Sequence, residues 1–297
     1  MKHTRRRNRF EFLIHIPFVL MSLCFLLPMM YIVSVSLSNE QDILKYGYLL
    51  IPKRIDLTGY RFLFENPKQL IDSYKVTTFF TFVGTFFSTL IMALVSYPIS
   101  RNSFTYRKPI TFFIFFTMIF SGGLIPTYIL ITNYLHLQNS IWVYIVPGLA
   151  SAFSINIFLS YFRTLPVSIL ESARIDGSSE TRIFFRIVLP LSKPVVATVA
   201  LFGLLGRWND YFTSMLYISD RSLYSLQYLL QKIMLEIEFM RANFDKIPIY
   251  LMDKVKEMPA ESTRMAIAVI AAGPMLLIFP FLQKYFTKGM TVGSLKG

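Results

Sequence analysis

The segment Glu171-Ser-Ala-Arg-Ile-Asp-Gly177, followed after nine residues by Ile187-Val-Leu-Pro190, is a polar stretch set between two long apolar runs. We call residues 163–193 the elbow. Charged side chains are costly inside a lipid bilayer, so the elbow is expected to lie outside the membrane while its flanks cross it. A hydrophobic protein does not need such an insert in order to fold, which indicates that a partner outside the membrane contacts it.

The composition is that of an integral membrane protein. Hydrophobic residues make up 54% of the chain and charged residues 16%, whereas soluble domains are roughly 25% charged. Several apolar runs reach the ~17–25 residues that a helix needs to cross the hydrocarbon core. The sequence therefore predicts an all-α protein with six transmembrane helices, over residues 12–37, 77–99, 110–131, 141–162, 195–218 and 265–286.

The charges are divided unequally between the two sides of these spans. The side that carries the N-terminal arm, the elbow and the C-terminal tail has 16 Lys and Arg against 4 Asp and Glu, and the other side has 13 against 12. Basic residues accumulate on the cytoplasmic side of membrane proteins. Both termini and the elbow are therefore predicted to be cytoplasmic. The net charge of +13 then reflects topology, and we expect membrane lipid and no nucleic acid as a partner.

The predicted organisation follows from these spans. The long external segment after the fifth span carries leucine and isoleucine at helical spacing from Leu223 to Ile237, which is typical of an amphipathic helix. We favour simple packing over membrane-surface or partner binding for it. The parts are a cytoplasmic arm (1–11), a first helix (12–37), an external segment (38–75), a core (76–287) with an external segment (219–264), and a cytoplasmic tail (288–297).

Three spans contain helix breakers. Gly122-Gly123 lies in the third span, Gly203 and Gly206 in the fifth, and Gly273-Pro274 with Pro280 in the sixth. Backbone groups freed within a bilayer must be satisfied by protein or water, and glycine also permits close helix contact. The breakers are consistent both with a transport path and with plain packing.

The elbow is expected to form a helix, a glycine turn and a second helix. Pro166 suits the start of the first helix, and Gly177 suits the left-handed position that ends it. Ser178 or Ser179 can cap the second helix. Pro190 is expected to break that helix before the fifth span, because the residue before a proline avoids helical geometry.

The fifth span holds a second polar group. Arg207, Trp208, Asn209, Asp210 and Tyr211 interrupt an apolar helix, and Arg207 lies twelve residues from Val195, or roughly 18 Å into the membrane. Ionisable groups at such depth indicate function by default. Aromatic, amide and carboxylate groups suit a sugar, so Trp208, Asn209, Asp210 and Tyr211 are candidates for a substrate path. The alternative is an Arg207–Asp210 pair beside an interfacial aromatic residue.

The elbow resembles the EAA loop of binding-protein-dependent ABC importer permeases. Glu171, Ala173, Gly177 and the Ile187–Pro190 end of the motif stand at the spacing of that family, and Ser172 departs from its first alanine. The resemblance implies the type I (MetI-like) permease fold, with a cytoplasmic coupling helix that sits in a cleft of an ATPase subunit. The residues it assigns to ATPase coupling are Glu171, Ser172, Ala173, Asp176, Gly177, Ile187, Leu189 and Pro190.

The resemblance extends beyond the elbow to the carbohydrate permeases similar to the MalG half of the maltose importer. The basic, glycine-rich tail from Lys288 to Gly297 is similar to theirs, and Ser121–Pro126 and Arg207–Asp210 resemble the Lpl-type subfamily. This implies a bacterial cytoplasmic membrane protein that forms a heterodimer with a second homologous permease. The other implied partners are two cytoplasmic ATPase subunits, an extracellular solute-binding protein and a sugar.

The sequence itself contains no G-x-x-x-x-G-K-[ST] phosphate loop. We therefore expect a transporter subunit that is not an enzyme, with no metal site and no bound cofactor, and with ATP and Mg²⁺ on the ATPase partners. The expected cargo is a carbohydrate, in particular an oligosaccharide. The alternatives are a peptide, polyamine or phosphate-ester importer of the same architecture, a membrane-embedded enzyme, and a channel or carrier that does not use ATP.

Overall fold

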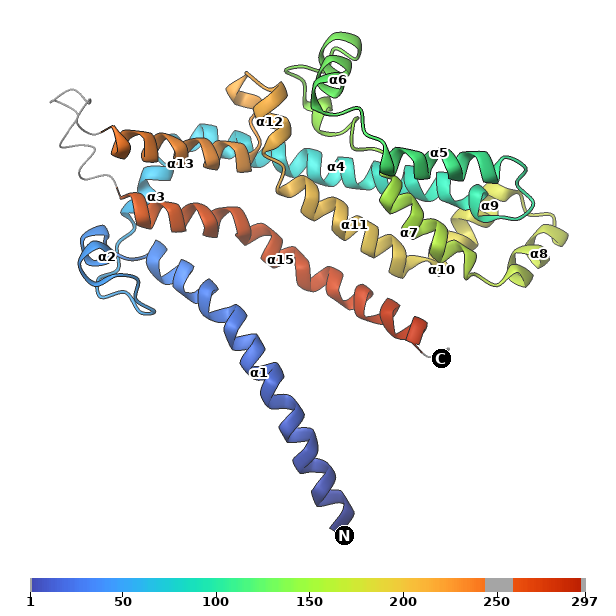
Figure 1. Ribbon diagram of the computed structural model, residues 1–297, viewed down its shortest axis with the longest axis horizontal. Helices are drawn as coiled ribbons and strands as arrows, with labels where there is room; N and C mark the ends of the chain where they lie inside the picture. The colour runs from blue at the N-terminus through green and yellow to red at the C-terminus, as the bar shows by residue number, and fades with distance from the viewer. Residues whose placement is uncertain (1, 244–258, 295–297) are drawn as a thin grey trace. The chain divides into compact units, whose positions relative to one another are not determined.

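The computed structural model describes the backbone of residues 2–243 and 259–294, and the side chains of 15–243, 259–278 and 280 (Figure 1). Every regular element among these residues is helical, and the only extended pairing is a single bridge between Ser38 and Ile55. The helices are α1 (Lys2–Ser36), α2 (Glu40–Tyr46), α3 (Thr58–Leu63), α4 (Pro67–Ser100), α5 (Arg107–Ile119), α6 (Leu124–Ile129), α7 (Ala152–Arg163), α8 (Val167–Ile175), α9 (Glu180–Ile183), α10 (Leu189–Leu191), α11 (Lys193–Trp208), α12 (Phe212–Tyr217), α13 (Leu226–Ala242) and α15 (Ala260–Ser294).

Short irregular helical turns link several of these helices. Leu130–Tyr134 and Phe184–Val188 are π-helical, and Ile141–Tyr144 and Arg221–Leu223 are 3₁₀-helical. The elbow consists of α8, α9, the second π-turn and α10, which lie together at one end of α4 (Figure 1). The predicted external segment 219–264 includes residues 244–258, which lie outside the described residues, as do the last three residues of the predicted tail.

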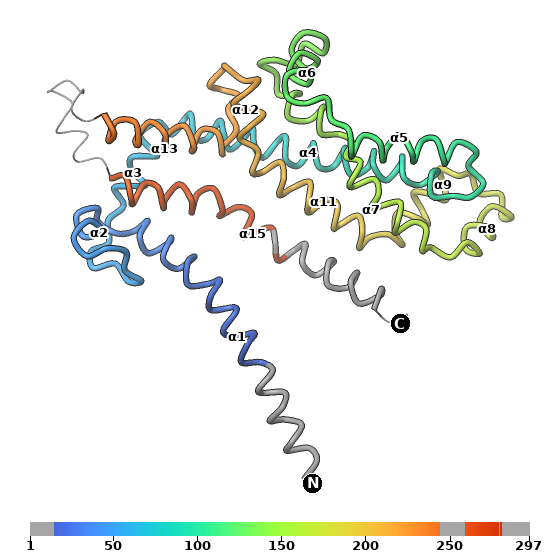
Figure 2. The backbone as a smooth tube through the Cα atoms, in the orientation of Figure 1, coloured from blue at the N-terminus to red at the C-terminus, as the bar shows by residue number. Residues whose placement is uncertain are grey.

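Three helices are long and apolar enough to cross a membrane without interruption: 15–36 of α1, all of α4, and 260–278 of α15. Three further candidates are pairs of helices bent at a short break. The α5–α6 pair bends by 114°, the α7–α8 pair by 77° and the chain from α9 into α11 by 81°. Figure 2 shows the sharp turn between α5 and α6, where Gly123 has a φ of +85°. The predicted break at Gly122-Gly123 is confirmed by this geometry.

Three predicted helices differ from the structure. The fifth span was expected over 195–218 with breakers at Gly203 and Gly206, but α11 runs through both glycines and ends at Trp208. The fourth span was expected to be helical over 141–162, but only 152–163 form an α-helix, because Pro147-Gly148 falls in an irregular stretch before α7. A Pro-Gly pair favours a turn over a helix. The sixth span was expected to break at Gly273-Pro274 and Pro280, but α15 runs through both prolines, as transmembrane helices can when neighbouring groups satisfy the freed carbonyls.

The chain divides into two compact units, and the first comprises residues 1–67 and 232–273. In this unit Glu40, the first residue of α2, contacts both the start of α15 and Arg241 of α13. The carboxylate accepts the backbone N–H groups of Glu261 and Ser262 at 3.0 and 3.1 Å, and it pairs with Arg241 at 3.0 Å. The first N–H groups of a helix have no partner within the helix, so Glu40 supplies the missing acceptors for the start of α15.

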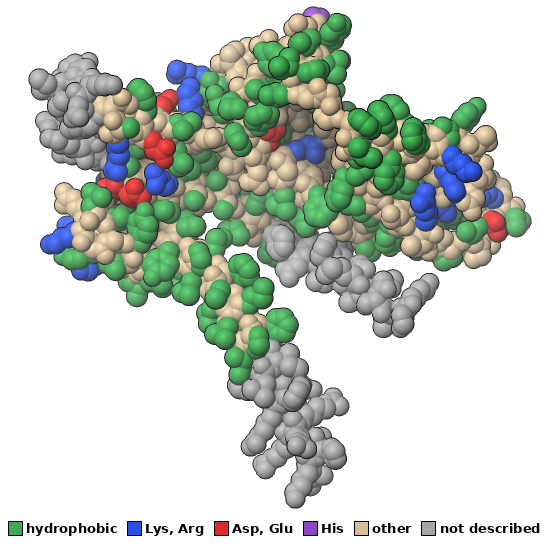
Figure 3. Space-filling view, in the orientation of Figure 1, with side chains coloured by type: hydrophobic (Ala, Val, Ile, Leu, Met, Phe, Trp, Pro, Cys, Tyr) green, Lys and Arg blue, Asp and Glu red, His purple; other side chains and the backbone are tan. Residues whose placement is uncertain are grey.

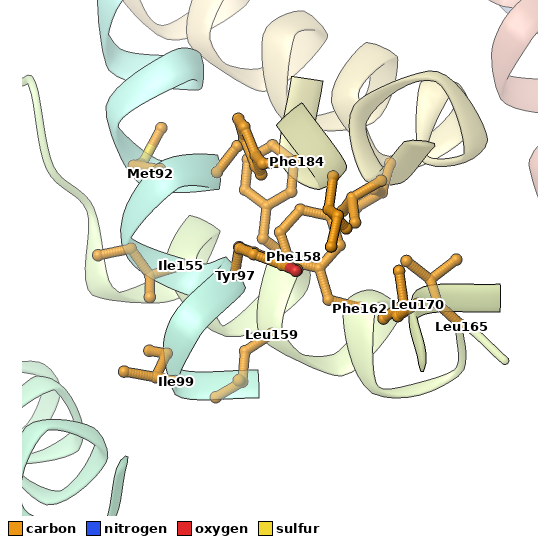
Figure 4. Close-up of a cluster of buried hydrophobic side chains, with 14 of the residues drawn as sticks. Met92, Tyr97, Ile99, Ile155, Phe158, Leu159, Phe162, Leu165, Leu170 and Phe184 are labelled. Carbon is orange, nitrogen blue, oxygen red and sulfur yellow. The ribbon is translucent and has the colours of Figure 1, made fainter. Parts of the chain in front are cut away.

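The second unit comprises residues 68–231 and 274–297. Its main hydrophobic core lies where α4, α7 and the elbow meet, and it includes Tyr97, Phe158, Phe162, Leu170 and Phe184 (Figure 4). Leu170 of α8 is 1% exposed and Phe158 of α7 is fully buried. Burying a side chain of this size stabilises a fold by about 1.5–3 kcal/mol, so the elbow is an integral part of this unit.

Small hydroxyl residues run along the buried face of α4. Thr77, Thr81 and Thr85 recur at helical spacing, and each is 5% exposed or less. Thr77 accepts the N–H of Leu226 at 2.8 Å, and Ser96 lies 3.1 Å from the carbonyl oxygen of Ile155. Small polar side chains allow helices to approach closely inside a membrane. This face of α4 is therefore the packing surface for α7, α11 and the start of α13.

The amphipathic stripe before and within α13 is used for packing, as predicted. Leu226, Leu230 and Ile237 are all at most 4% exposed. In contrast, α5 has no buried residue, and its Phe112 and Phe113 are 72% and 66% exposed. Such a surface suits the hydrocarbon of a bilayer.

Candidate functional site

The first candidate site is α8, the first helix of the elbow. Pro166 caps it, and Ser179 accepts the N–H of Arg182 to cap α9 after it. Between the two helices Gly177 has a φ of +79°, and a Cβ added there would meet no atom within 4 Å. The glycine is therefore required by its left-handed backbone and not by lack of space. These features confirm the predicted helix, glycine turn and second helix.

The two faces of α8 have different environments. Leu170 and Ala173 are buried in the core, whereas Glu171, Ser172 and Asp176 are exposed. Ile169 is 43% exposed, and Ile175 is 86% exposed. The outer face of α8 thus presents acidic, small and apolar groups together. Sequence reasoning missed Ile175 and Val167 as exposed apolar groups on this face, because their exposure depends on how α8 packs.

The second half of the motif lies differently. Ile187 and Leu189 are half-buried and pack against the main core, while Pro190 is exposed. Leu189 keeps helical geometry (φ −62°, ψ −45°) in spite of the proline that follows it, and its N–H donates to the Phe184 carbonyl in the π-turn. The predicted break before the fifth span is present, but it lies at Ser192, two residues after Pro190, and the expectation that Leu189 avoids helical geometry is wrong.

A polar chain ties α8 to the end of α4. Arg174 Nε donates to Glu180 Oε1 at 2.6 Å, and the Tyr97 hydroxyl donates to Glu180 Oε2 at 2.7 Å. The Arg174 guanidinium beside Glu180 is the main cause that holds the pKa of this carboxyl below its usual range. Arg101 lies over the Tyr97 ring at 5.5 Å and donates to the Phe162 carbonyl. The elbow is thus fixed to α4 by bonds as well as by burial.

The second candidate site is a cavity of about 500 Å³ inside the second unit. A hollow in the middle of the face drawn in Figure 3 shows a basic and an acidic side chain within it. Volumes of this size are typical of small-molecule sites. Four helices, α4, α7, α11 and α12, contribute to the wall, together with the irregular stretch that precedes α7. The lining residues are Ser88, Met92, Val143, Tyr144, Pro147, Gly148, Ser151, Phe153, Ser154, Val199, Phe202, Gly203, Gly206, Arg207, Asp210 and Thr213.

Arg207 is held against three glycines. A Cβ on Gly84 would lie 2.5 Å from its Nε, and one on Gly148 would lie 3.1 Å from Nη2. A Cβ on Gly203, one turn earlier in α11, would lie 3.5 Å from Nη1. Nη2 donates to the Gly148 carbonyl at 2.7 Å. The guanidinium therefore occupies a space that side chains at Gly84 and Gly148 would fill.

The four predicted substrate-path residues lie in different surroundings. Asp210 lines the cavity, and its Oδ1 accepts the Thr213 N–H at 3.0 Å. Trp208 is 2% exposed, with its ring centroid 6.4 Å from that of Tyr74. Asn209 donates to the Leu205 carbonyl at 2.8 Å, and Tyr211 is 40% exposed. Of the four, the cavity brings in Asp210 alone.

Sequence reasoning missed most of the cavity wall. Tyr144 lies in it, donates to the Leu223 carbonyl at 2.8 Å and stacks on Phe80 at 4.3 Å. The Pro147-Gly148 pair was an available signal, because irregular backbone at membrane depth occurs where it lines a cavity or is covered by protein. The hydroxyl groups of Ser88 and Ser151 carry no comparable signal in the sequence.

Comparison with known proteins gives a consistent result. Residues 75–292 match the family described as "Binding-protein-dependent transport system inner membrane component". The polygalacturonan/rhamnogalacturonan transport system permease protein YtcP of Bacillus subtilis (strain 168) is 36% identical over 98% of this chain and 100% of its own length. The galactooligosaccharides transport system permease protein GanQ of the same organism is 31% identical over 84% of this chain and 83% of its own length.

A solved structure is also similar. The crystal structure of a bacterial ABC transporter involved in the import of the acidic polysaccharide alginate contains a chain that superimposes with a TM-score of 0.77. The two chains are 28% identical, and the match covers 94% of this chain and 97% of that one. The bent helix pairs and the elbow therefore belong to an architecture that recurs in a solved importer.

Proposed function

We propose a function from one premise: the chain belongs to the family of binding-protein-dependent transport system inner membrane components. It is thus a multi-pass membrane permease subunit with the type I ABC importer fold, and it is not an enzyme. We propose in addition its cargo, its partner subunits and its orientation in the membrane.

The proposed cargo is a carbohydrate, in particular an oligosaccharide. The relatives named above carry polygalacturonan or rhamnogalacturonan and galactooligosaccharides, and the similar solved importer carries alginate. These names favour a sugar over a peptide, a polyamine or a phosphate ester. They include both acidic and neutral sugars, so they do not decide the charge of the cargo.

The proposed coupling site is the outer face of α8. The single observation that carries it is that Leu170 and Ala173 anchor the helix in the core while Glu171, Ser172 and Asp176 face outward. A rigidly anchored helix with a free polar face can transmit a push from a docked subunit to the spans. Ile187 and Leu189 contribute by holding the second half of the elbow against the same core.

The proposed assembly pairs this chain with a second homologous permease as a heterodimer. Two cytoplasmic ATPase subunits would bind ATP and Mg²⁺, and an extracellular solute-binding protein would deliver the sugar. The proposed orientation places both termini and the elbow in the cytoplasm, which the excess of basic residues on that side supports. The host membrane is the bacterial cytoplasmic membrane.

The proposed substrate path follows the cavity beside α11. Asp210 and Arg207 line it directly. Trp208, packed beside Tyr74, is proposed to hold the end of α11 in place. Asn209 and Tyr211 lie in the break between α11 and α12, and we keep both as proposed residues of the substrate path.

Reversing a charge on α8 tests the coupling proposal. The complex with Glu171→Lys is expected to retain assembly in detergent but to lose sugar-stimulated ATP hydrolysis in proteoliposomes. Glu65→Lys is the matched control, because Glu65 is also exposed and lies in the segment predicted to be external. Equal stimulation in Glu171→Lys and wild type would remove this face of α8 from the coupling site.

A further inference from the structure

The Arg207 side chain has unused hydrogen-bonding capacity in the cavity. A guanidinium carries five N–H donors and no acceptor. Among the described residues its only hydrogen bond runs from Nη2 to the Gly148 carbonyl, and the buried Nε has no partner. The remaining donors of Nη1 and Nη2 are the ones that a molecule in the cavity can meet.

The position is built for this side chain. Gly84 lies inside α4, where glycine is less stable than alanine by roughly 0.5–1 kcal/mol. The guanidinium fills the space that an alanine Cβ would need, since that Cβ would lie 2.5 Å from Nε. With Gly148 on the opposite side, the backbone at two distant points of the chain leaves room for one cation. A lipid-facing or incidental arginine would not require such a recess.

The charge of Arg207 has no bonded counterion in the described part of the chain. Asp210 is the only acidic residue in the cavity wall, and no ion pair within 4.0 Å joins the two. One Asp210 oxygen is engaged by the Thr213 N–H at the start of α12. A charge at membrane depth without a hydrogen-bonded counterion is costly, so an anion that enters the cavity would be attracted to Arg207.

We propose that Arg207 binds a carboxylate of the sugar in transit, and that the cargo is an acidic oligosaccharide containing uronate units. This inference rests on the proposed function as a sugar importer. Arginine matches a carboxylate with paired, charge-assisted hydrogen bonds. Because Nε faces Gly84, the carboxylate meets the guanidinium end-on, through Nη1 and Nη2. The hydroxyl groups of Ser88, Ser151 and Ser154 line the same cavity and suit the hydroxyls of the sugar ring.

The nearby Asp210 suits a site of passage. A carboxylate in the wall weakens the hold on an acidic ligand, and transport requires binding that is strong enough for entry and weak enough for exit. Asp210 therefore opposes tight capture while Arg207 selects for charge. This arrangement predicts opposite effects when the two charges are removed.

The test uses two cargos that share one sugar backbone, a uronate trisaccharide and its fully methyl-esterified form, in which each carboxylate is replaced by an uncharged and slightly larger ester. The full complex with its solute-binding protein is reconstituted in proteoliposomes, and uptake of each is measured. Wild type is expected to favour the acid, and Arg207→Gln to reduce that preference by roughly tenfold, the loss of one charge-assisted pair. Arg207→Lys is expected to keep much of the preference, and Asp210→Asn is expected to raise it.

Four outcomes separate the proposals. If wild type takes up the ester as well as the acid, or Arg207→Gln lowers both cargos equally while Arg207→Lys does the same, the carboxylate site is overturned and the importer stands. If neither form of the uronate trisaccharide is taken up but a neutral oligosaccharide is, the acidic cargo is overturned and the sugar importer stands; if none of the three stimulates ATP hydrolysis or uptake by the wild-type complex, the proposed carbohydrate cargo itself fails. If Arg207→Gln does not assemble, the wild-type and Arg207→Lys preferences for the two cargos still decide.

Discussion

The elbow and the cavity both contain an arginine and an acid close together in sequence, and they use them differently. At the elbow Arg174 and Glu180 form a 2.6 Å ion pair that Tyr97 extends to α4. In the cavity Arg207 and Asp210 stand three residues apart on neighbouring turns, and each bonds to backbone instead. A closed set of bonds fixes a structure, whereas donors left open within a cavity are available to a ligand. The elbow is therefore suited to the proposed coupling role, and the cavity to the proposed binding role.

The largest effect is expected at the turn that shapes the elbow. Gly177→Val places a β-branched residue at a φ of +79°, which should destabilise the folded elbow by about 2 kcal/mol. ATP hydrolysis would then be uncoupled from uptake, as measured by the ratio of sugar transported to ATP consumed. Gly177→Asn is the control, because asparagine tolerates this region. An unchanged ratio in the valine variant would show that the turn is not needed for transmission.

The next effect probes the recess in the cavity. Gly84→Ala forces the guanidinium to move, and loss of its bond to Gly148 should cost about 1.5–3 kcal/mol, offset by about 1 kcal/mol of helix propensity. Thermal unfolding of the purified complex and uptake of the acidic cargo should both fall. Gly273→Ala is a matched control inside α15, since a Cβ there meets no atom within 4 Å and Gly273 does not line the cavity. Similar behaviour of the two variants would contradict the assigned recess.

A smaller effect is expected when the bond between the elbow and α4 is cut. Tyr97→Phe removes the hydroxyl that donates to Glu180 and should lower stability by about 1 kcal/mol. Combined with Glu180→Gln, the loss should be less than the sum of the single losses, because both changes remove the same bond. Strict additivity in thermal unfolding would show that the bond does not contribute.

The smallest effect is the pH dependence of the Glu180 network. The folded-state pKa of Glu180 is lowered from 4.5, first by its bond to Arg174. Its contribution is present above pH 4.5 and is lost as the pH falls through the lower folded value. Because the carboxylate is 57% exposed, the effect should be a few tenths of a kcal/mol at most. Wild type should lose slightly more stability than Glu180→Gln below pH 4.5, and parallel curves would argue against the pair.

What the sequence predicted well was set by local rules. The left-handed turn at Gly177, the cap at Ser179 and the break at Gly123 each depend on neighbouring residues, and all three appear in the structure. Pro190 shows the limit of such rules. The helix continues through this proline to Leu191, after a π-turn, and the chain bends only at Ser192.

The cavity could not be predicted in the same way. Its recess for Arg207 is made by Gly84 and Gly148, which are far apart in the chain and meet only through packing. The spacing of Trp208, Asn209, Asp210 and Tyr211 placed them together in sequence, but the end of α11 turns them toward different surroundings. Local patterns thus located the polar segment, and tertiary packing determined which of its side chains face the cavity.

The Glu40 cap on α15 has a consequence for how this fold can be divided. The family match begins at residue 75, yet the acceptor that completes the start of the last helix comes from α2, before that boundary. A fragment cut at residue 75 would expose the N–H groups of Glu261 and Ser262 and leave Arg241 without this carboxylate. In this chain the last helix of the matched region therefore depends on α2 for its cap, and a graft of that region onto another N-terminal segment would have to supply an equivalent acid.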